Sequence, residues 1–145
     1  MIMGFHHTGI ATEDLDRLSQ FYVDLFHGSV LNAFSWNEDN EALSLRLGLE
    51  ASSGRLVMIG FATGKLELFQ FDTPQIAQSG SLRSVAKPGL SHVCFQVDDC
   101  HAELERLETA GMTFHASALK MPGGGIFAYG RDPDGNVVEI LQLPK

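Results

Sequence analysis

Two segments of the chain have apolar side chains at helical spacing, and each predicts an amphipathic helix. The segments are residues 14–26 and residues 100–110. Acidic residues that can cap a helix precede each segment, and Gly28 and Gly111 follow, where glycine favours a helix end. The apolar stripes consist of Leu15, Leu18, Phe21, Tyr22 and Leu25 in the first segment, and of Leu104, Leu107 and Ala110 in the second.

Strands are predicted after each helix, because apolar and polar side chains alternate there or because short apolar runs lie between turn residues. Thr63-Gly64 predicts a tight turn in the first half, and Asp132-Pro133-Asp134-Gly135 predicts a hairpin turn in the second. The expected strands are residues 43–49, 55–62, 65–71, 126–129 and 136–143.

The pattern occurs twice along the chain, which indicates an internal repeat. Residues 5–30 and 90–115 each contain a histidine in a short extended segment, then acidic residues, a helix and a glycine-containing turn. The chain therefore reads as one α+β domain of two modules, the first at about 1–72 and the second at about 90–145. Residues 73–89, with their prolines and glycines, form the expected linker.

Four side chains stand out because each half supplies one histidine and one glutamate from corresponding strands. These are His7 and Glu67 in the first half, and His92 and Glu139 in the second. Each glutamate is surrounded by apolar side chains, where a carboxylate is costly unless it is paired or bound to a metal. Each residue alone also fits a structural histidine or a solvent-facing glutamate. Their joint placement favours one divalent ion, with Zn, Ni, Co, Mn and Fe(II) all suitable.

The composition and charge of the chain limit the classes of partner that such a site can bind. The chain has 145 residues and a formal net charge of −8, which argues against a nucleic acid and against an anionic membrane surface as partners. No apolar run reaches the length of a membrane-spanning helix, and the N-terminus lacks the features of a signal peptide. Two cysteines form no disulfide framework, so we expect a cytoplasmic protein with a small-molecule substrate.

The motifs around these four residues resemble the vicinal oxygen chelate superfamily, which includes glyoxalase I, methylmalonyl-CoA epimerase, extradiol dioxygenases and antibiotic-resistance proteins. The resemblance implies two βαβββ modules that form a cup-shaped mixed sheet, with helices outside and a metal inside. It places all four residues at the metal-ligand positions of the family, and it implies a homodimer in which modules are sometimes exchanged. The motifs are His7-Thr8-Gly9-Ile10, Leu66-Glu67-Leu68, Ser91-His92-Val93 and Asp132-Pro133-Asp134-Gly135-Asn136 running into Glu139.

The resemblance favours a glyoxalase-like lyase or isomerase that acts on a small carbonyl substrate through a metal-stabilised enolate. Glu139 is the preferred base for proton transfer, with Glu67 as the symmetric candidate. Tyr129 and Arg131 are candidate substrate-binding residues, although Arg131 also fits a solvated surface charge.

Two other classes of function stay open. An Fe(II) extradiol-type dioxygenase would use His7, His92 and Glu139, and Tyr129 matches a tyrosine of those enzymes. The acid histidine of that family is missing from its expected position, where Ala77 and Gln78 stand. The other alternative is a small-molecule binding protein of the antibiotic-resistance type.

Overall fold

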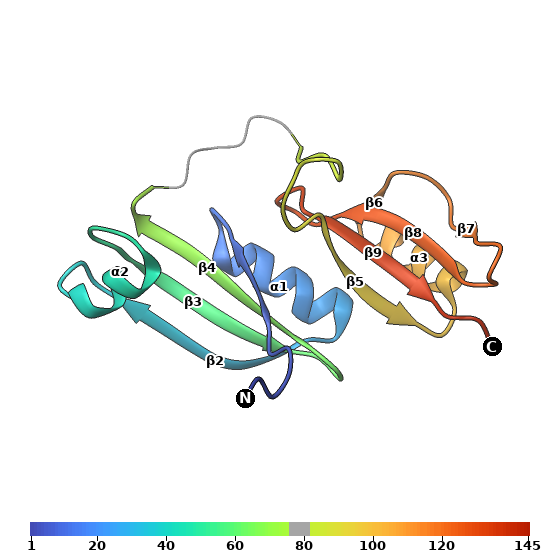
Figure 1. The fold of residues 1–145 in the computed structure, drawn as a ribbon. Helices are drawn as coiled ribbons and strands as arrows, with labels where there is room; N and C mark the ends of the chain where they lie inside the picture. Colours follow the sequence, from blue (N-terminus) through green and yellow to red (C-terminus); the bar gives the residue numbers. More distant parts are fainter. Residues whose placement is uncertain (76–81) are drawn as a thin grey trace. The chain divides into compact units, whose positions relative to one another are not determined.

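The computed structural model describes residues 1–75 and 82–145. It divides into two compact units, Met1–Gln78 and Ser79–Lys145, and each consists of a mixed sheet with a helix packed on one face (Figure 1). Part of the expected linker, including Ala77 and Gln78, lies outside the described residues. None of the helices in the described ranges is long and apolar enough to cross a membrane.

The first unit has a four-stranded sheet in the order β1-β4-β3-β2, in which β1 runs parallel to β4 and the other neighbours are antiparallel. Helix α1 packs against β3 and β4, and a short second helix, α2, precedes β3. The elements are β1 (Thr8–Ala11), α1 (Leu15–Phe26), β2 (Ser29–Trp36), α2 (Glu41–Leu47), β3 (Ser53–Gly60) and β4 (Lys65–Thr73).

The second unit repeats this plan with the order β5-β9-β8-β6, and the short strand β7 also pairs with β8. Again the first strand, β5, runs parallel to the last, β9, and helix α3 packs against β8 and β9. The α+β fold with two modules of one strand, one helix and further strands is therefore confirmed. The elements are β5 (His92–Val97), α3 (Cys100–Thr109), β6 (Thr113–Phe114), β7 (Leu119–Lys120), β8 (Ile126–Arg131) and β9 (Val137–Gln142).

Both main helices begin where the sequence predicted. Asp14 caps α1 by accepting a hydrogen bond from the Arg17 amide, and Asp99 caps α3 in the same way. The end of α1 differs from the prediction, because His27 rather than Gly28 takes the left-handed conformation, with φ 56°. Gly28 is required by packing instead, since a Cβ there would lie 2.5 Å from Ile59 Cγ2.

The strand predicted at 43–49 is wrong, because residues 41–47 form helix α2. Asn40 caps this helix by accepting from the Leu43 amide, and Gly48 ends it with φ 74°. The alternating leucines predicted a strand with one buried face, but Leu45 is 77% exposed, so these leucines do not form such a face.

The strand that actually follows α1 is β2, which the sequence pattern did not predict. All its residues except Trp36 are exposed, so neither of its faces carries a periodic apolar signal. Pairing with β3 defines this strand, and such pairing is a long-range contact that local periodicity does not encode.

Candidate metal centre

His7 and Glu67 lie together in the first unit because of the parallel pairing of β1 and β4. Gly9 is opposite Glu67 in the register, and His7 precedes Gly9 by two residues. The His7 Nε2 atom lies 3.2 Å from Glu67 Oε2, and both side chains are partly buried.

The second unit places His92 and Glu139 in the same relationship. Cys94 is opposite Glu139 across the parallel pair β5 and β9, and His92 precedes Cys94 by two residues. His92 Nε2 lies 3.0 Å from Glu139 Oε2. The repeat seen in the sequence is thus also a repeat of side-chain geometry, with one imidazole–carboxylate pair in each unit.

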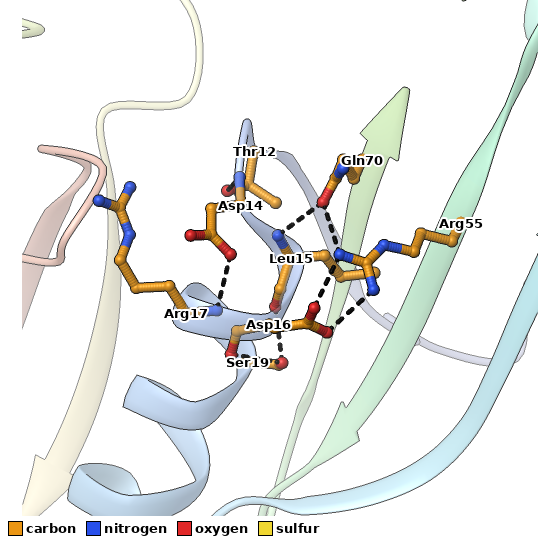
Figure 2. A network of polar contacts seen from close by, with 8 residues as sticks. All are labelled: Thr12, Asp14, Leu15, Asp16, Arg17, Ser19, Arg55 and Gln70. Atoms are coloured by element: carbon orange, nitrogen blue, oxygen red, sulfur yellow. Dashed lines mark hydrogen bonds and ion pairs between the residues drawn. The ribbon is translucent and has the colours of Figure 1, made fainter. Parts of the chain in front are cut away.

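Both glutamates lie on the sheet face opposite the packed helix. In β4, Leu66 and Leu68 are buried, and the Gln70 side chain accepts a hydrogen bond from the Leu15 amide at the start of α1 (Figure 2). Because successive side chains of a strand point to opposite faces, Glu67 points away from the face that α1 covers. Alternation in β9 gives the same result, because Val138 and Ile140 are buried and Gln142 bonds to α3.

A glutamine three residues after each glutamate ties its strand to the neighbouring helix. Gln70 Oε1 accepts from the Leu15 amide at 2.9 Å, and Gln142 Oε1 accepts from the Cys100 amide at 2.9 Å. Each bond satisfies an amide of the first helical turn, which has no partner within the helix. The repeated Glu-x-x-Gln spacing was visible in the sequence, and our sequence analysis missed its meaning.

An arginine strengthens this junction in the first unit. Arg55 donates to both carboxylate oxygens of Asp16, at 3.0 and 2.9 Å, and to Gln70 Oε1 at 3.0 Å (Figure 2). Asp16 lies in α1 and Gln70 faces that helix, so the network lies on the helix face of the sheet. Its role is to fix α1 against β3 and β4, away from Glu67.

Each histidine has its Nδ1 atom bonded to the residue that precedes it. Ser91 Oγ lies 2.8 Å from His92 Nδ1, and a hydroxyl can donate or accept there. His6 Nδ1 lies 2.8 Å from His7 Nδ1, and Lys65 Nζ lies 2.8 Å from His6 Nε2.

The lysine imposes a direction on this chain of bonds. An ammonium group only donates, so His6 Nε2 accepts and the neutral His6 ring carries its proton on Nδ1. That proton is donated to His7 Nδ1, which leaves the His7 proton on Nε2, facing Glu67. A metal bound at His7 Nε2 would take the place of this proton, so the neutral His7 ring would then carry its proton on Nδ1 and the contact with His6 Nδ1 would have to change.

Glu139 has two further hydrogen-bond donors, Tyr129 and Cys94. Cys94 is exposed as a residue, yet desolvation raises the pKa of its thiol to about 12, and the negative charge of Glu139 acts in the same direction. The same two causes raise the pKa of Tyr129, whose ring lies edge-on to His92 with centroids 5.3 Å apart. Both groups are therefore protonated donors at neutral pH.

Arg131 bonds within its own unit. Its Nε donates to His115 Nε2 at 2.8 Å, and its Nη1 donates to the carbonyl oxygens of Arg83 and Gly135 at 2.7 and 2.8 Å. These bonds fix the turn between β8 and β9. Contact of Arg131 with substrate stays a prediction.

The donor set fits a divalent metal in its chemistry and in its spacing. Two ligand atoms each about 2.1 Å from one ion lie roughly 3.0–3.4 Å apart, and both imidazole–carboxylate pairs have separations close to this range. Within residues 1–75 and 82–145, no cluster of three or more such side chains could hold a metal. Each pair alone would thus leave most of the coordination sphere of an ion unfilled.

Comparison with known proteins assigns the family. Residues 4–140 match the model of the Glyoxalase/Bleomycin resistance protein/Dioxygenase superfamily, and the chain belongs to this superfamily. A glyoxalase family protein from Bacillus cereus has the same fold, with a TM-score of 0.88 and 18% identity over 100% of this chain and 97% of that chain.

Two curated relatives carry the name of one activity. The chain is 27% identical to a lactoylglutathione lyase of Schizosaccharomyces pombe, covering 94% of this chain and 46% of that protein. It is 25% identical to a probable lactoylglutathione lyase of Vibrio parahaemolyticus, covering 94% of this chain and 88% of that protein. The chain therefore spans about half the length of the yeast relative and most of the bacterial one.

Proposed function

We propose that this protein is a metal-dependent lyase or isomerase of the glyoxalase type that acts on a small carbonyl substrate. The observation that carries the proposal is the imidazole–carboxylate pair that recurs in both units with the same register and with separations of 3.2 and 3.0 Å. The superfamily and the names of two relatives support it.

In this proposal His7, Glu67, His92 and Glu139 together hold one divalent ion. A bound ion would supply a Lewis acid that stabilises negative charge on the substrate oxygen as an enolate forms. One of the two carboxylates takes the proton from the carbon beside the carbonyl, and the C–H electron pair moves into the enolate. The same proton is then returned to a neighbouring carbon, so the reaction is an isomerisation with no external oxidant or reductant.

Aromatic side chains give the substrate an apolar surface beside Glu67. Phe69 and Phe71 share its face of β4, and their rings are stacked with centroids 5.8 Å apart. Glutathione adducts, acyl-CoA thioesters and small hydroxy-ketones all have a carbonyl with a removable proton beside it. The first assay should therefore include all three substrate classes.

Metal content and turnover test the proposal together. We expect natively purified protein to contain a divalent metal by elemental analysis, and we expect a chelator to lower its Tm. Formation of lactoylglutathione from methylglyoxal and glutathione should be lost with the metal and restored by Zn, Ni, Co, Mn or Fe(II). Protein that carries no metal, and whose Tm no added metal changes, would contradict the proposal and favour a binding protein.

A matched pair of substitutions compares the effect on turnover of losing a carboxylate in the site with that of losing one elsewhere in the second unit. Glu139→Gln should reduce turnover at least ~100-fold while the circular dichroism spectrum is retained, because the site loses a charged ligand. Glu103→Gln is the control, since Glu103 lies in α3 and pairs with Arg106. Wild-type turnover in Glu139→Gln would exclude this residue from the site.

One observation favours ring cleavage as the second candidate. The Tyr129 ring lies edge-on to His92 and Tyr129 is opposite Glu139 in the register, and these are two of the three residues that an Fe(II) dioxygenase would use. Fe(II)-loaded protein that consumed oxygen in the presence of a catechol, and did not isomerise carbonyl substrates, would establish this alternative.

A further inference from the structure

The sheet face that carries Glu67 continues into two rows of apolar residues. Side chains on one face of a strand are two residues apart, so successive rows are separated by about 7 Å. The nearer row is therefore within reach of a small molecule whose carbonyl lies at Glu67. From β2 through β3 to β4, the nearer row consists of Phe34, Leu56 and Phe69, and the farther row consists of Trp36, Gly54 and Phe71.

Four aromatic rings of these rows contact one another, and together they form an aromatic cluster of Phe34, Trp36, Phe69 and Phe71. On β2 the rings of Phe34 and Trp36 are parallel within 8°, with centroids 6.3 Å apart. On β4 the rings of Phe69 and Phe71 are parallel within 11°, with centroids 5.8 Å apart. The Trp36 ring joins the two pairs, because it lies edge-on to Phe69 and Phe71 at 6.5 and 5.6 Å.

Buried polar contacts fix the indole of Trp36 at the centre of the aromatic cluster. Its Nε1 atom donates to Ser52 Oγ at 3.0 Å, and Ser52 Oγ lies 2.9 Å from Ser44 Oγ. Gly54 leaves the space that the indole occupies, since a Cβ there would lie 3.1 Å from Trp36 Cη2. The one polar atom of the indole thus has a partner, and the cluster offers a ligand only ring and hydrocarbon surface.

The rim of the aromatic cluster is accessible, although its centre is buried. Phe34 is 49% exposed, and Phe69 and Phe71 are partly exposed, whereas Trp36 is buried. A ligand would therefore contact the phenylalanine rings, and the indole would lie directly behind them.

The second unit does not repeat these rings. Leu141 follows Glu139 by two residues, at the place that Phe69 has after Glu67, and Gln96 is opposite Leu141 on the neighbouring strand. The same sheet topology therefore forms without an aromatic side chain at this place. This difference between the units favours a role for the aromatic cluster that is particular to the first unit.

The absence of charge in the two rows limits what can bind there. All six of their residues are uncharged, in a chain with a formal net charge of −8. Glutathione carries two carboxylates and an ammonium group, and CoA carries several phosphates, and each of these groups needs a polar partner when it leaves water. A neutral aromatic ring needs no such partner, and it gains free energy from burial and from contact with other rings.

We infer that the aromatic cluster binds an aryl group, and that the substrate is a small neutral aryl ketone with a hydroxyl on the carbon beside its carbonyl. This inference rests on the proposed function, which places the carbonyl at the site around Glu67. An aryl ring joined directly to the carbonyl carbon extends from there toward Phe34 and Phe69, in the row about 7 Å away. The inference selects the small hydroxy-ketones over the glutathione and CoA derivatives.

The fluorescence of Trp36 tests aryl binding directly, because Trp36 is the single tryptophan of the chain. We would titrate the full-length metal-free protein with 2-hydroxyacetophenone, an aryl ketone that quenches indole fluorescence, and we expect saturable quenching. Hydroxyacetone has the same carbonyl and hydroxyl but a methyl group in place of the ring, and in competition it should bind at least ~10-fold more weakly. Quenching that does not saturate, or equal affinity for the two ketones, would overturn the inference.

Substitutions at the accessible rim locate the bound ring. Phe34→Leu and Phe69→Leu should each raise the dissociation constant of 2-hydroxyacetophenone at least ~3-fold, because leucine stays apolar but loses the ring contact. Phe21→Leu is the matched control and should leave the constant unchanged, since Phe21 lies on α1 and contacts Tyr22 and Phe26. Unchanged affinity in both cluster variants, with the circular dichroism spectrum retained, would overturn the inference. The comparison of the two ketones needs no variant.

Deuterium exchange separates this inference from the proposed function. In D₂O, a hydrogen on the carbon beside the ketone carbonyl leaves as a proton and a deuteron from the solvent replaces it, with no oxidant or reductant. With Zn²⁺ bound, we expect kcat/KM for exchange to be at least ~10-fold higher for 2-hydroxyacetophenone than for hydroxyacetone. Saturable aryl binding without metal-dependent exchange of either ketone would refute the proposed function and leave an aryl-binding site. Metal-dependent exchange with equal kcat/KM for both ketones would overturn the inference and retain the proposed function.

Discussion

At the scale of single residues, the surroundings of the Cys94 thiol lower its reactivity although the residue is exposed. The residue is exposed, but desolvation and the nearby Glu139 carboxylate raise the pKa of its thiol to about 12. A raised pKa lowers the thiolate fraction at neutral pH, and only the thiolate attacks an alkylating reagent. The thiol should therefore be inert in the native protein.

Alkylation of the metal-free protein tests this contact. At pH 8 we expect Cys94 to react roughly a thousand-fold more slowly than in unfolded protein, with the rate rising as the pH approaches 12. Glu139→Gln removes the charge and should speed the reaction. Mass spectrometry separates Cys94 from the buried Cys100. Rapid labelling of native Cys94 at neutral pH would show that desolvation and Glu139 do not raise the pKa of its thiol.

Single residues also show how much of the site could be predicted from the sequence. The apolar neighbours of Glu67 and Glu139 indicated which residues to watch, because a carboxylate in such a run needs a partner. The Lys65–His6 contact and the donors at Glu139 could not be predicted, since they join residues that are far apart in the sequence.

At the scale of elements, the two glutamine side chains connect each glutamate-bearing strand to the start of a helix. Gln70→Ala and Gln142→Ala each leave a partly buried amide without its acceptor, at Leu15 and Cys100. We expect each to cost about 1–2 kcal/mol of stability. Amide hydrogen exchange should accelerate in the first turn of α1 for Gln70→Ala and of α3 for Gln142→Ala.

Gln20→Ala is the control for this pair, because Gln20 is exposed on α1 and its amide donates to Asp24. It should change stability by less than about 0.5 kcal/mol. Equal effects of Gln20→Ala and Gln70→Ala on exchange would mean that the bond to Leu15 contributes nothing to holding the helix.

Elements differed in how well the pattern predicted them. Helices α1 and α3 combine an apolar stripe with an acidic cap, two independent signals that agree. Helix α2 gives a conflicting signal, because its leucines alternate as they would in a strand. Strand β2 gives a weak signal, because it is exposed along almost its whole length. Amphipathic periodicity predicts an element only where one face is buried.

At the scale of the whole molecule, the central question is how many metal ions one chain binds. Each unit supplies two ligands, and within the described residues no cluster of three ligating side chains could hold an ion. Two protein ligands hold a divalent ion weakly compared with three or four. If the two pairs share an ion, tight binding requires both units, and the stoichiometry is one ion per chain.

We expect isothermal titration of the metal-free protein to give one tight Zn²⁺ site per chain, and His7→Ala or His92→Ala each to weaken it at least ~100-fold. Two independent sites per chain, each lost with its own histidine alone, would contradict a shared site.

Mixing two complementary variants tests the expected homodimer, in which modules are sometimes exchanged. A chain lacking His7 and Glu67, combined with one lacking His92 and Glu139, regains an intact site only if each site joins two chains. Tight binding restored on mixing therefore identifies exchange, whereas loss in both chains and in the mixture assigns the site to a single chain.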